Sequence, residues 1–346
     1  MKSTQINQQS YSYACFSKDL KLRLSSSSGA MFSLYASYIL KHGGVVYGVS
    51  FTDDFKSAEF RRVTSERELD PLRCSKYFQA HMGNTYINVK NDLDNGITVF
   101  FCGTGCQVNG LKKFLIKEYT NLYTADIICH GTPSQALWQK YLDYVKSSNT
   151  DEIEKINLRC KTYKNQKIVK DGNNLYVSMK ENSFMRLFLK DCCLRPSCYG
   201  CKARTSRMSD VTIADFWGIS NIIPEMNDGN GCSLVITRTS KGLSLFKDIR
   251  DQIIYREVSY EDAVKNNPSE YRSCTRPKSR DTFYQDMNTL GIEQLVDKYA
   301  NDFKTRFWRN AANTKKSMKR MLKCKNSPNN SDYGMLIEFR SKEKSN

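Results

Sequence analysis

The stretch ITVFFCGTGCQVNGLKKFL, residues 97–115, and the stretch NLYTADIICHGTPSQALW, residues 121–138, share one pattern. Each begins with an apolar run typical of a buried strand, continues through a short turn and ends in an amphipathic helix. Two such units in succession are typical of parallel βαβ connections. The sequence therefore predicts an α/β fold with a parallel βαβ-type core.

The segments around this core extend the prediction. Upstream, we expect a helix after SSSSGAM with Ser28 as its N-cap, then strands over residues 45–51 and 58–63. The pattern SERE, residues 65–68, predicts a capping box on a short helix. Downstream, short strands mixed with helices predict an α+β second half, and the pattern from Asp281 onward is helical.

We divide the chain into three regions. Residues 1–150 form the α/β region, residues 151–290 an α+β region, and residues 291–346 a helical, basic tail. The net charge is +17, and residues 304–346 alone hold 12 Lys+Arg and 3 Asp+Glu, with a helix-like segment over Lys304–Lys325. Such charge indicates an anionic partner or a solvated tail, and the lack of a known reader motif disfavours nucleic acid.

Cysteine use indicates a reducing, cytoplasmic setting. The chain has 13 cysteines in 346 residues, and an odd number without a signal peptide argues against a disulfide scaffold. No run of about 18 apolar residues occurs, so we predict no membrane span. Free cysteines usually pack as small apolar residues. We expect that role for Cys15, Cys160, Cys232, Cys274 and Cys324.

Four other cysteines occupy positions where a metal site is expected. Cys106 and Cys129 follow the two predicted parallel strands, whose carboxyl ends are the usual ligand-binding edge. Cys198 and Cys201 form a CxxC pair in LRPSCYGCKARTSRMSDVTIADFWG, residues 194–218. Four thiolates suit either zinc or a 4Fe–4S cluster. One pair plus two remote cysteines at βα turns favours the cluster, because structural zinc usually takes two close pairs.

Polar residues near these turns have two interpretations each. The opening Ser27–Gly29 presents backbone N–H groups that suit a phosphate, or is an ordinary capped helix start. Lys76 is a phosphate contact or a surface lysine. His130, beside Cys129, is a proton donor near neutral pH or makes a structural hydrogen bond to its loop.

Five stretches, in a fixed order over roughly residues 11–290, carry a resemblance to a known family. They are SSSSGAMFSLYASYILKHGGVVYGVSF, CSKYFQA, FFCGTGCQVNGLKKFL, DIICHGTPSQALWQKYL and LRPSCYGCKARTSRMSDVTIADFWGI. Together they resemble the family of the coenzyme F420 hydrogenase/dehydrogenase beta subunit. The resemblance implies an iron–sulfur flavoprotein that passes electrons between a 4Fe–4S cluster, FAD and a second substrate.

The resemblance also implies roles for individual residues. The cluster ligands would be Cys106, Cys129, Cys198 and Cys201. The flavin contacts would be Ser27, Ser28, Gly29, Lys76, Gly103, Thr104, Gln107 and Arg204. Arg204, Arg207 and Asp215 are either cofactor contacts or buried ion-pair partners, and His130 is the candidate catalytic residue.

The chain departs from the family pattern in three places. Gly105 stands where the family usually has proline, Ala30 stands where it has a second glycine, and Cys102 is an alternative ligand one turn from Cys106. The sequence also has no N-terminal ferredoxin module with repeated CxxCxxCxxxCP runs. We therefore expect either that electrons come from a separate ferredoxin-like protein or that the chain has given up electron transfer.

We therefore expect a cytoplasmic oxidoreductase that depends on FAD and a 4Fe–4S cluster and has a protein or small-molecule redox partner. Short relatives of this kind resemble proteins of polysaccharide biosynthesis, which suggests a sugar-related substrate. The alternative is a zinc-stabilised or cofactor-free binding or scaffold protein of a surface-polysaccharide pathway. The first hypothesis predicts a brown protein and the alternative a colourless one.

Overall fold

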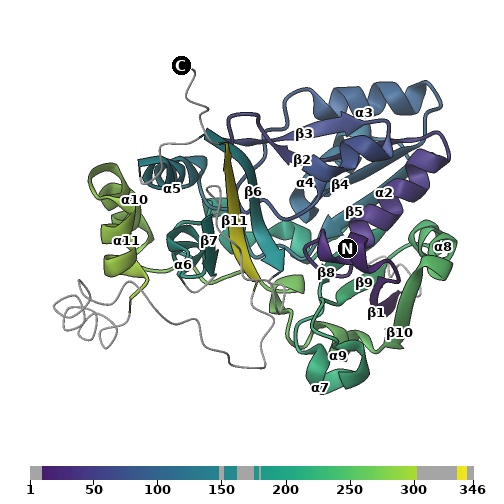
Figure 1. Cartoon of the computed structure of the whole chain (residues 1–346). Coiled ribbons are helices and arrows are strands. Elements are labelled where there is room, and N and C mark those ends of the chain that lie inside the picture. The colour runs from purple at the N-terminus through teal and green to yellow at the C-terminus, as the bar shows by residue number, and fades with distance from the viewer. Residues whose placement is uncertain (1–9, 148–151, 162–174, 179–180, 302–332, 341–346) are drawn as a thin grey trace, which may run out of the picture.

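An eight-stranded mixed sheet is the larger of two sheets in the computed structural model and lies on the right in Figure 1. Its strands are β1 (Tyr11–Ser17), β2 (Val45–Phe51), β3 (Ala58–Val63), β4 (Val99–Thr104), β5 (Leu122–Ile127), β8 (Val211–Asp215), β9 (Ser233–Thr237) and β10 (Ile253–Val258). The strand order is β10-β1-β9-β8-β5-β4-β2-β3. Strands β2, β4, β5 and β8 run parallel, and the remaining neighbours are antiparallel. The predicted α/β fold with a parallel core is confirmed.

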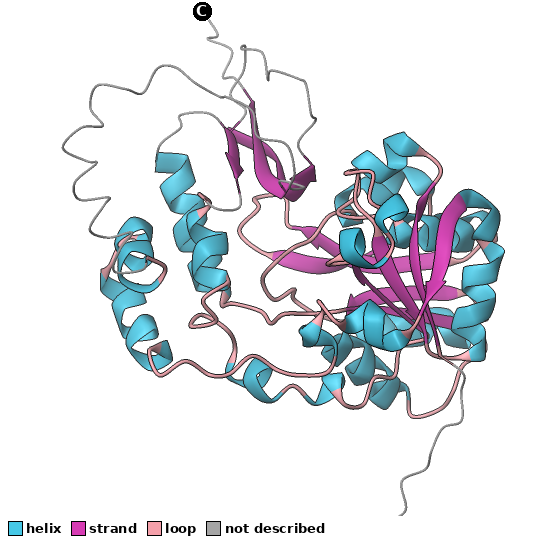
Figure 2. Cartoon of the chain, turned by 90° about the horizontal axis from the view of Figure 1, so that it is seen from below, coloured by secondary structure: helices cyan, strands magenta, loops and turns pink. Residues whose placement is uncertain are grey.

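Helices cover both faces of this sheet (Figure 2). Helices α2 (Met31–Lys41) and α8 (Ser240–Asp248) pack on the face that includes Phe100. Helices α3 (Thr85–Asp94) and α4 (Gly105–Leu115) pack on the opposite face, which includes Phe101. Because β4 is buried from both sides, its sequence from Val99 to Cys102 is continuously apolar rather than alternating.

A second, three-stranded antiparallel sheet lies between the large sheet and a group of helices (Figure 1). Its order is β6-β11-β7, formed by β6 (Glu152–Lys161), β7 (Leu175–Ser178) and β11 (Tyr333–Arg340). The helices are α5 (Gln135–Ser147), α6 (Ser183–Phe188), α10 (Arg280–Thr289) and α11 (Ile292–Tyr299). Trp138 and Phe184, both fully buried, lie in the core that these elements share.

Short helices complete the described chain. They are α1 (Leu20–Leu24), α7 (Ile219–Ile222), α9 (Tyr260–Val264) and the 3₁₀ helices η1 (Glu66–Leu72), η2 (Pro196–Gly200), η3 (Lys202–Arg204), η4 (Pro224–Met226), η5 (Arg250–Gln252) and η6 (Pro268–Glu270). The structure describes residues 10–147, 152–161, 175–178, 181–301 and 333–340. No helix in these ranges has the length and hydropathy needed to cross a membrane.

The structure changes two of the predicted elements. Helix α2 begins at Met31 with Ala30 as its N-cap, so the assignment of Ser28 as N-cap is wrong. Ser28 Oγ instead donates to the Cys232 carbonyl at 2.8 Å. The predicted helical tail is wrong for residues 333–340, which form β11, and the predicted segment 304–325 lies outside the described residues.

Strands from both sides of residue 150 join the large sheet, because β8, β9 and β10 extend the sheet formed by β1 to β5. The division at residues 150 and 290 therefore describes sequence regions, and its use as a domain boundary stays a prediction. The capping box predicted over residues 65–68 is confirmed, with Ser65 and Glu68 at the start of η1.

Candidate metal and flavin site

The turn after β4 presents Cys106 at the carboxyl end of the parallel strands. Thr104 is the N-cap of α4, and its backbone N–H donates to Gln107 Oε1 at 2.9 Å, completing a capping box. A side chain on Gly103 would place its Cβ 3.0 Å from the same Oε1 atom. Thr104 Oγ1 lies 3.1 Å from Cys106 Sγ, and Cys106 is exposed. Gly103, Thr104 and Gln107 thus shape the turn that carries this cysteine.

The loop with the CxxC pair is attached to the turn after β5. Leu194 forms a bridge with Pro133, and the Arg195 N–H donates to the Thr132 carbonyl at 2.9 Å. Thr132 Oγ1 lies 3.7 Å from Cys198 Sγ, on η2. Segments about 60 residues apart in the sequence are therefore joined directly beside Cys129.

The thiols of Cys106 and Cys198 are close enough to Cys129 to affect its pKa. Burial, together with the charges of Cys106 and Cys198, raises the pKa of Cys129 to about 12, while Arg204 opposes the shift. A cation bound here would favour the thiolates that are otherwise unfavourable together. Cys201 follows at the end of the same loop, and its N–H donates to Ser273 Oγ at 3.0 Å.

Arg204 joins the loops around this cluster of cysteines. Its guanidinium is buried and donates to the carbonyls of Cys129 and His130 at 2.6 and 2.9 Å. It also donates to the carbonyls of Ser269 and Arg272, both at 2.6 Å. The residue therefore holds the turn after β5 against the loop of residues 269–274.

A buried ion network lies beneath the start of α4. Arg207 pairs with Asp126 at 2.5 Å and with Glu270 at 2.8 Å, and Glu270 also pairs with Arg238. The two carboxylates raise the pKa of Arg207. A Cβ on Gly105 would lie 2.9 Å from Asp126 Oδ2 and 3.3 Å from Arg207 Nη1. The absence of a side chain at Gly105 therefore gives this network its space.

His130 lies on the other side of Cys129. Its Nε2 is 2.6 Å from Asp191 Oδ1, and its ring makes an edge contact with Phe188 at 5.1 Å. The bond to Asp191, followed by a contact with Cys274, raises the pKa of His130 to about 9. This geometry favours the structural interpretation of His130, and its catalytic role stays a prediction.

Cys274 is only half-buried, and its Sγ lies 3.8 Å from His130 Nδ1 and 3.7 Å from Nε2. The sequence suggested a plain core residue, and the thiol does pack against the core, but it also belongs to the surroundings of the candidate site. Cys15 and Cys232 are buried as predicted. The side chain of Cys160 and all of Cys324 lie outside the described residues.

The predicted flavin loop, Ser27–Gly29, lies directly before α2. Ser27 Oγ lies 3.2 Å from Ser75 Oγ, and the Gly29 N–H donates to Ser233 Oγ at 2.8 Å. Lys76 Nζ donates to the carbonyls of Pro71, Arg73 and Cys74 at 2.6, 2.7 and 3.3 Å. Burial lowers the pKa of Lys76 to about 8. Its ammonium thus stabilises the loop that carries Ser75.

Three further residues lie between this loop and His130. Arg159 pairs with Asp215 at 3.0 Å, donates to Tyr77 Oη at 3.3 Å and lies 5.5 Å from the ring centre of Trp217. The Tyr77 ring lies 5.5 Å from that of Phe188, which contacts His130. Tyr77 lies in the CSKYFQA stretch and Trp217 in the ADFWG stretch. The sequence analysis identified both stretches but predicted no role for these two residues.

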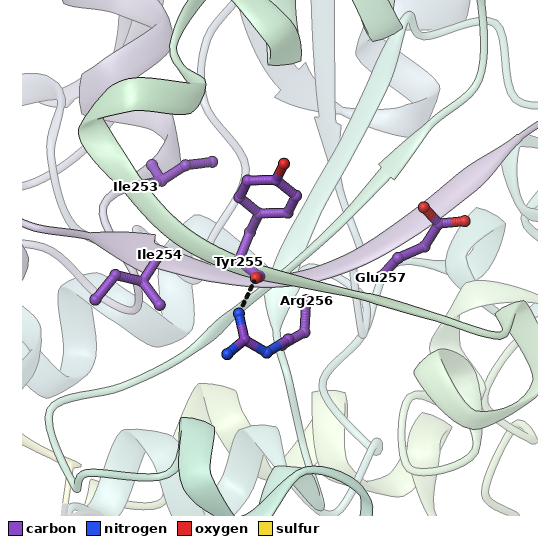
Figure 3. Close-up of a pocket in the computed structure, with 5 residues that line it drawn as sticks. All are labelled: Ile253, Ile254, Tyr255, Arg256 and Glu257. Carbon is purple, nitrogen blue, oxygen red and sulfur yellow. Dashed lines mark hydrogen bonds between the residues drawn. The ribbon is translucent and has the colours of Figure 1, made fainter.

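A shallow groove lies elsewhere, along the outer edge strand β10 (Figure 3). It is lined by Ile253, Ile254, Tyr255, Arg256 and Glu257. None of the predicted site residues lines it. The chemistry-bearing side chains therefore gather at the carboxyl ends of β4, β5 and β8 and not in this groove.

Residues 97–263 match a family model that describes the C-terminal part of the coenzyme F420 hydrogenase/dehydrogenase beta subunit. Over these residues the chain matches this family. The matched part runs from the strand before Cys106 to α9 and includes all four predicted cluster cysteines. Ser27–Gly29, Lys76 and Cys274 lie outside it. The match to a family of hydrogenase and dehydrogenase beta subunits indicates a redox role.

A search among solved structures found a chain of the F420-reducing [NiFe] hydrogenase complex from Methanosarcina barkeri, studied by xenon derivatization. The two share 12% identity with a TM-score of 0.49, over 92% of this chain and 97% of that one. A search among curated proteins found no match.

Proposed function

We propose that this chain is an iron–sulfur flavoprotein oxidoreductase of the coenzyme F420 hydrogenase/dehydrogenase beta subunit family. It passes electrons between a 4Fe–4S cluster, FAD and a redox partner, which is a separate ferredoxin-like protein or a small molecule. The resemblance to short relatives suggests a cytoplasmic enzyme that acts in polysaccharide biosynthesis. When bound, the two cofactors supply one-electron and two-electron transfer.

The convergence of cysteines from three loops is the observation that carries this proposal. Cys106 and Cys198 both raise the pKa of Cys129, although the three residues follow different elements. The four cysteines are not a group whose ligand atoms all lie within 4.8 Å of one another. Among the described residues, the group that meets this limit is His130, Asp191 and Cys274. One zinc ion would need its four thiolates about 3.8 Å apart, given Zn–S bonds near 2.3 Å. The wider spacing of the cysteines supports a cluster.

The donor set also fits a cluster. Four thiols without an intervening carboxylate suit iron–sulfur chemistry. Cys106, Cys129, Cys198 and Cys201 would hold the cluster, and Arg204 would keep the loop of Cys129 in place through its four carbonyl contacts. The buried guanidinium also places a positive charge beside the cluster, which favours thiolate ligands.

The N-terminus of α2 supports the FAD proposal. Its N-cap, Ala30, has no side-chain oxygen and makes no side-chain capping bond. The first N–H groups of a helix lack partners within the helix, so a flavin phosphate would satisfy them. Ser27, Ser28 and Gly29 would shape this approach, and Lys76 would act through the Ser75 loop. Thr104 and Gln107 would contribute through the turn that they cap, beside Gly103.

Anaerobic purification followed by iron, zinc and flavin assays tests this function. We expect about four irons and one FAD per chain, with a brown colour. Cys198→Ser should lose iron, whereas the matched control Cys74→Ser, another half-buried cysteine, should keep it. A colourless protein with one zinc and no flavin would instead support the binding or scaffold alternative and reject the redox proposal.

A further inference from the structure

We propose that His130, Asp191 and Cys274 form a separate binding site for one zinc ion. Their ligand atoms all lie within 4.8 Å of one another, which no other group of such side chains in the described ranges achieves. His130 Nε2 is 2.6 Å from Asp191 Oδ1, and Cys274 Sγ is 3.7 Å from the same nitrogen. The proposal does not depend on the iron–sulfur function.

The three residues come from three different loops. His130 follows β5, Asp191 follows α6, and Cys274 follows η6. The nitrogen, oxygen and sulfur donors therefore do not come together simply because they are neighbours on one helix or strand. Each of the three side chains is half-buried, so an ion can enter from solvent while losing part of its hydration.

The surrounding contacts hold these loops in place. Arg204 donates both to the His130 carbonyl and to the carbonyls of the loop that precedes Cys274. The Tyr199 hydroxyl donates to the Asp191 carbonyl. Asp191 has a φ of 62°, in the left-handed region that few non-glycine residues adopt. The contact with His130 Nε2 at 2.6 Å holds the Asp191 carboxylate in this direction.

The donor chemistry selects the metal class. Imidazole, carboxylate and thiolate together suit Zn²⁺, which accepts nitrogen, oxygen and sulfur ligands and often takes three protein ligands and one water. The 3.7 Å between sulfur and nitrogen matches two corners of a tetrahedral zinc site. The nitrogen–oxygen separation of 2.6 Å would have to widen by about 0.7 Å to admit the ion.

Titration with Co²⁺, followed by competition with Zn²⁺, tests this site spectroscopically. The protein is the Cys106→Ser/Cys198→Ser variant, which removes two predicted cluster ligands and leaves the three proposed zinc ligands in place. We expect one Co²⁺ per chain, a thiolate-to-cobalt absorption band, and displacement by one Zn²⁺. Adding Cys274→Ala should abolish the band, and adding Asp191→Asn should weaken cobalt binding at least about 10-fold. The control Cys74→Ala should leave both unchanged.

The absence of a stoichiometric ion, or a thiolate band that survives Cys274→Ala, would overturn the proposal. If the double variant does not fold, zinc and iron are measured in the otherwise unchanged chain. Loss of zinc with unchanged iron in Cys274→Ala supports a separate site. Joint loss of both metals, or retention of zinc, rejects it. Failure of the iron–sulfur proposal is seen independently, as a lack of iron in the wild type.

Discussion

Replacement of Arg207 by methionine tests the buried ion network beneath the candidate site. The Arg207 side chain is 6% exposed, and its partners Asp126 and Glu270 are 1% and 2% exposed. Methionine keeps much of the volume and removes the charge. In this variant Glu270 still pairs with Arg238. Asp126 still accepts a hydrogen bond from the Thr212 hydroxyl at 2.6 Å, but among the described residues it no longer has a cation beside it.

Removing one partner of a buried ion pair costs about 3–5 kcal/mol, because the other charge stays buried without compensation. One of the two acids keeps an arginine, so we expect the lower end, about 3 kcal/mol of unfolding free energy. Adding Asp126→Asn removes the uncompensated charge. The double variant should therefore lose about 1–2 kcal/mol less than the sum of the single losses.

Urea unfolding followed by circular dichroism measures these differences. The matched control is Arg61→Met, because Arg61 pairs with Asp53 and Glu59 on the surface and is 36% exposed. Such surface pairs contribute less than about 1 kcal/mol. If Arg207→Met destabilises the protein no more than Arg61→Met does, the network has no structural weight and the reasoning is refuted.

Three further predictions concern the same region. Gly29→Ala would place a Cβ 2.4 Å from a β1 carbonyl, so we expect a loss of about 1–3 kcal/mol in urea unfolding, while Gly200→Ala, which meets open space, should be neutral. Burial lowers the pKa of Lys161 from 10.5 to about 8, so the folded chain releases a proton that the unfolded chain keeps up to about pH 10.5. Stability should therefore rise between about pH 8 and 10.5 relative to Lys161→Met, and a constant difference would contradict this. Arg204→Gln should weaken iron retention during dialysis about 10–100-fold at unchanged secondary structure, and full retention would show that its carbonyl contacts do not support the site.

Local patterns explain why much of the fold was predictable. The five apolar positions of α5, Leu137, Trp138, Tyr141, Leu142 and Val145, are all buried as their helical spacing predicts. The strand at residues 58–63 matches its predicted bounds because a turn with two aspartates separates it from β2. These features depend on periodicity and turn chemistry within a short window.

The remaining elements depend on distant partners. Strands β1 and β10 were not predicted, and they are stabilised by pairing with each other and, for β1, with β9. The same limit applies to the site. The spacing of Cys198 and Cys201 was readable, whereas the approach of Cys274 to His130 joins positions 144 residues apart. No short window contains that information.

The position of β1 and β11 within the sheets has a consequence for synthesis in the cell. β1, the first described strand, lies between β9 and β10, so its backbone partners are about 220–240 residues further along the chain. At about 5–20 residues per second, a ribosome needs roughly 10–50 seconds to produce them. Through that interval the nascent β1 exposes unpaired backbone groups to other chains. β11 likewise fills the space between β6 and β7, which are both synthesised well before it. Nascent chains of this protein should therefore depend on chaperones until β9, β10 and β11 have emerged.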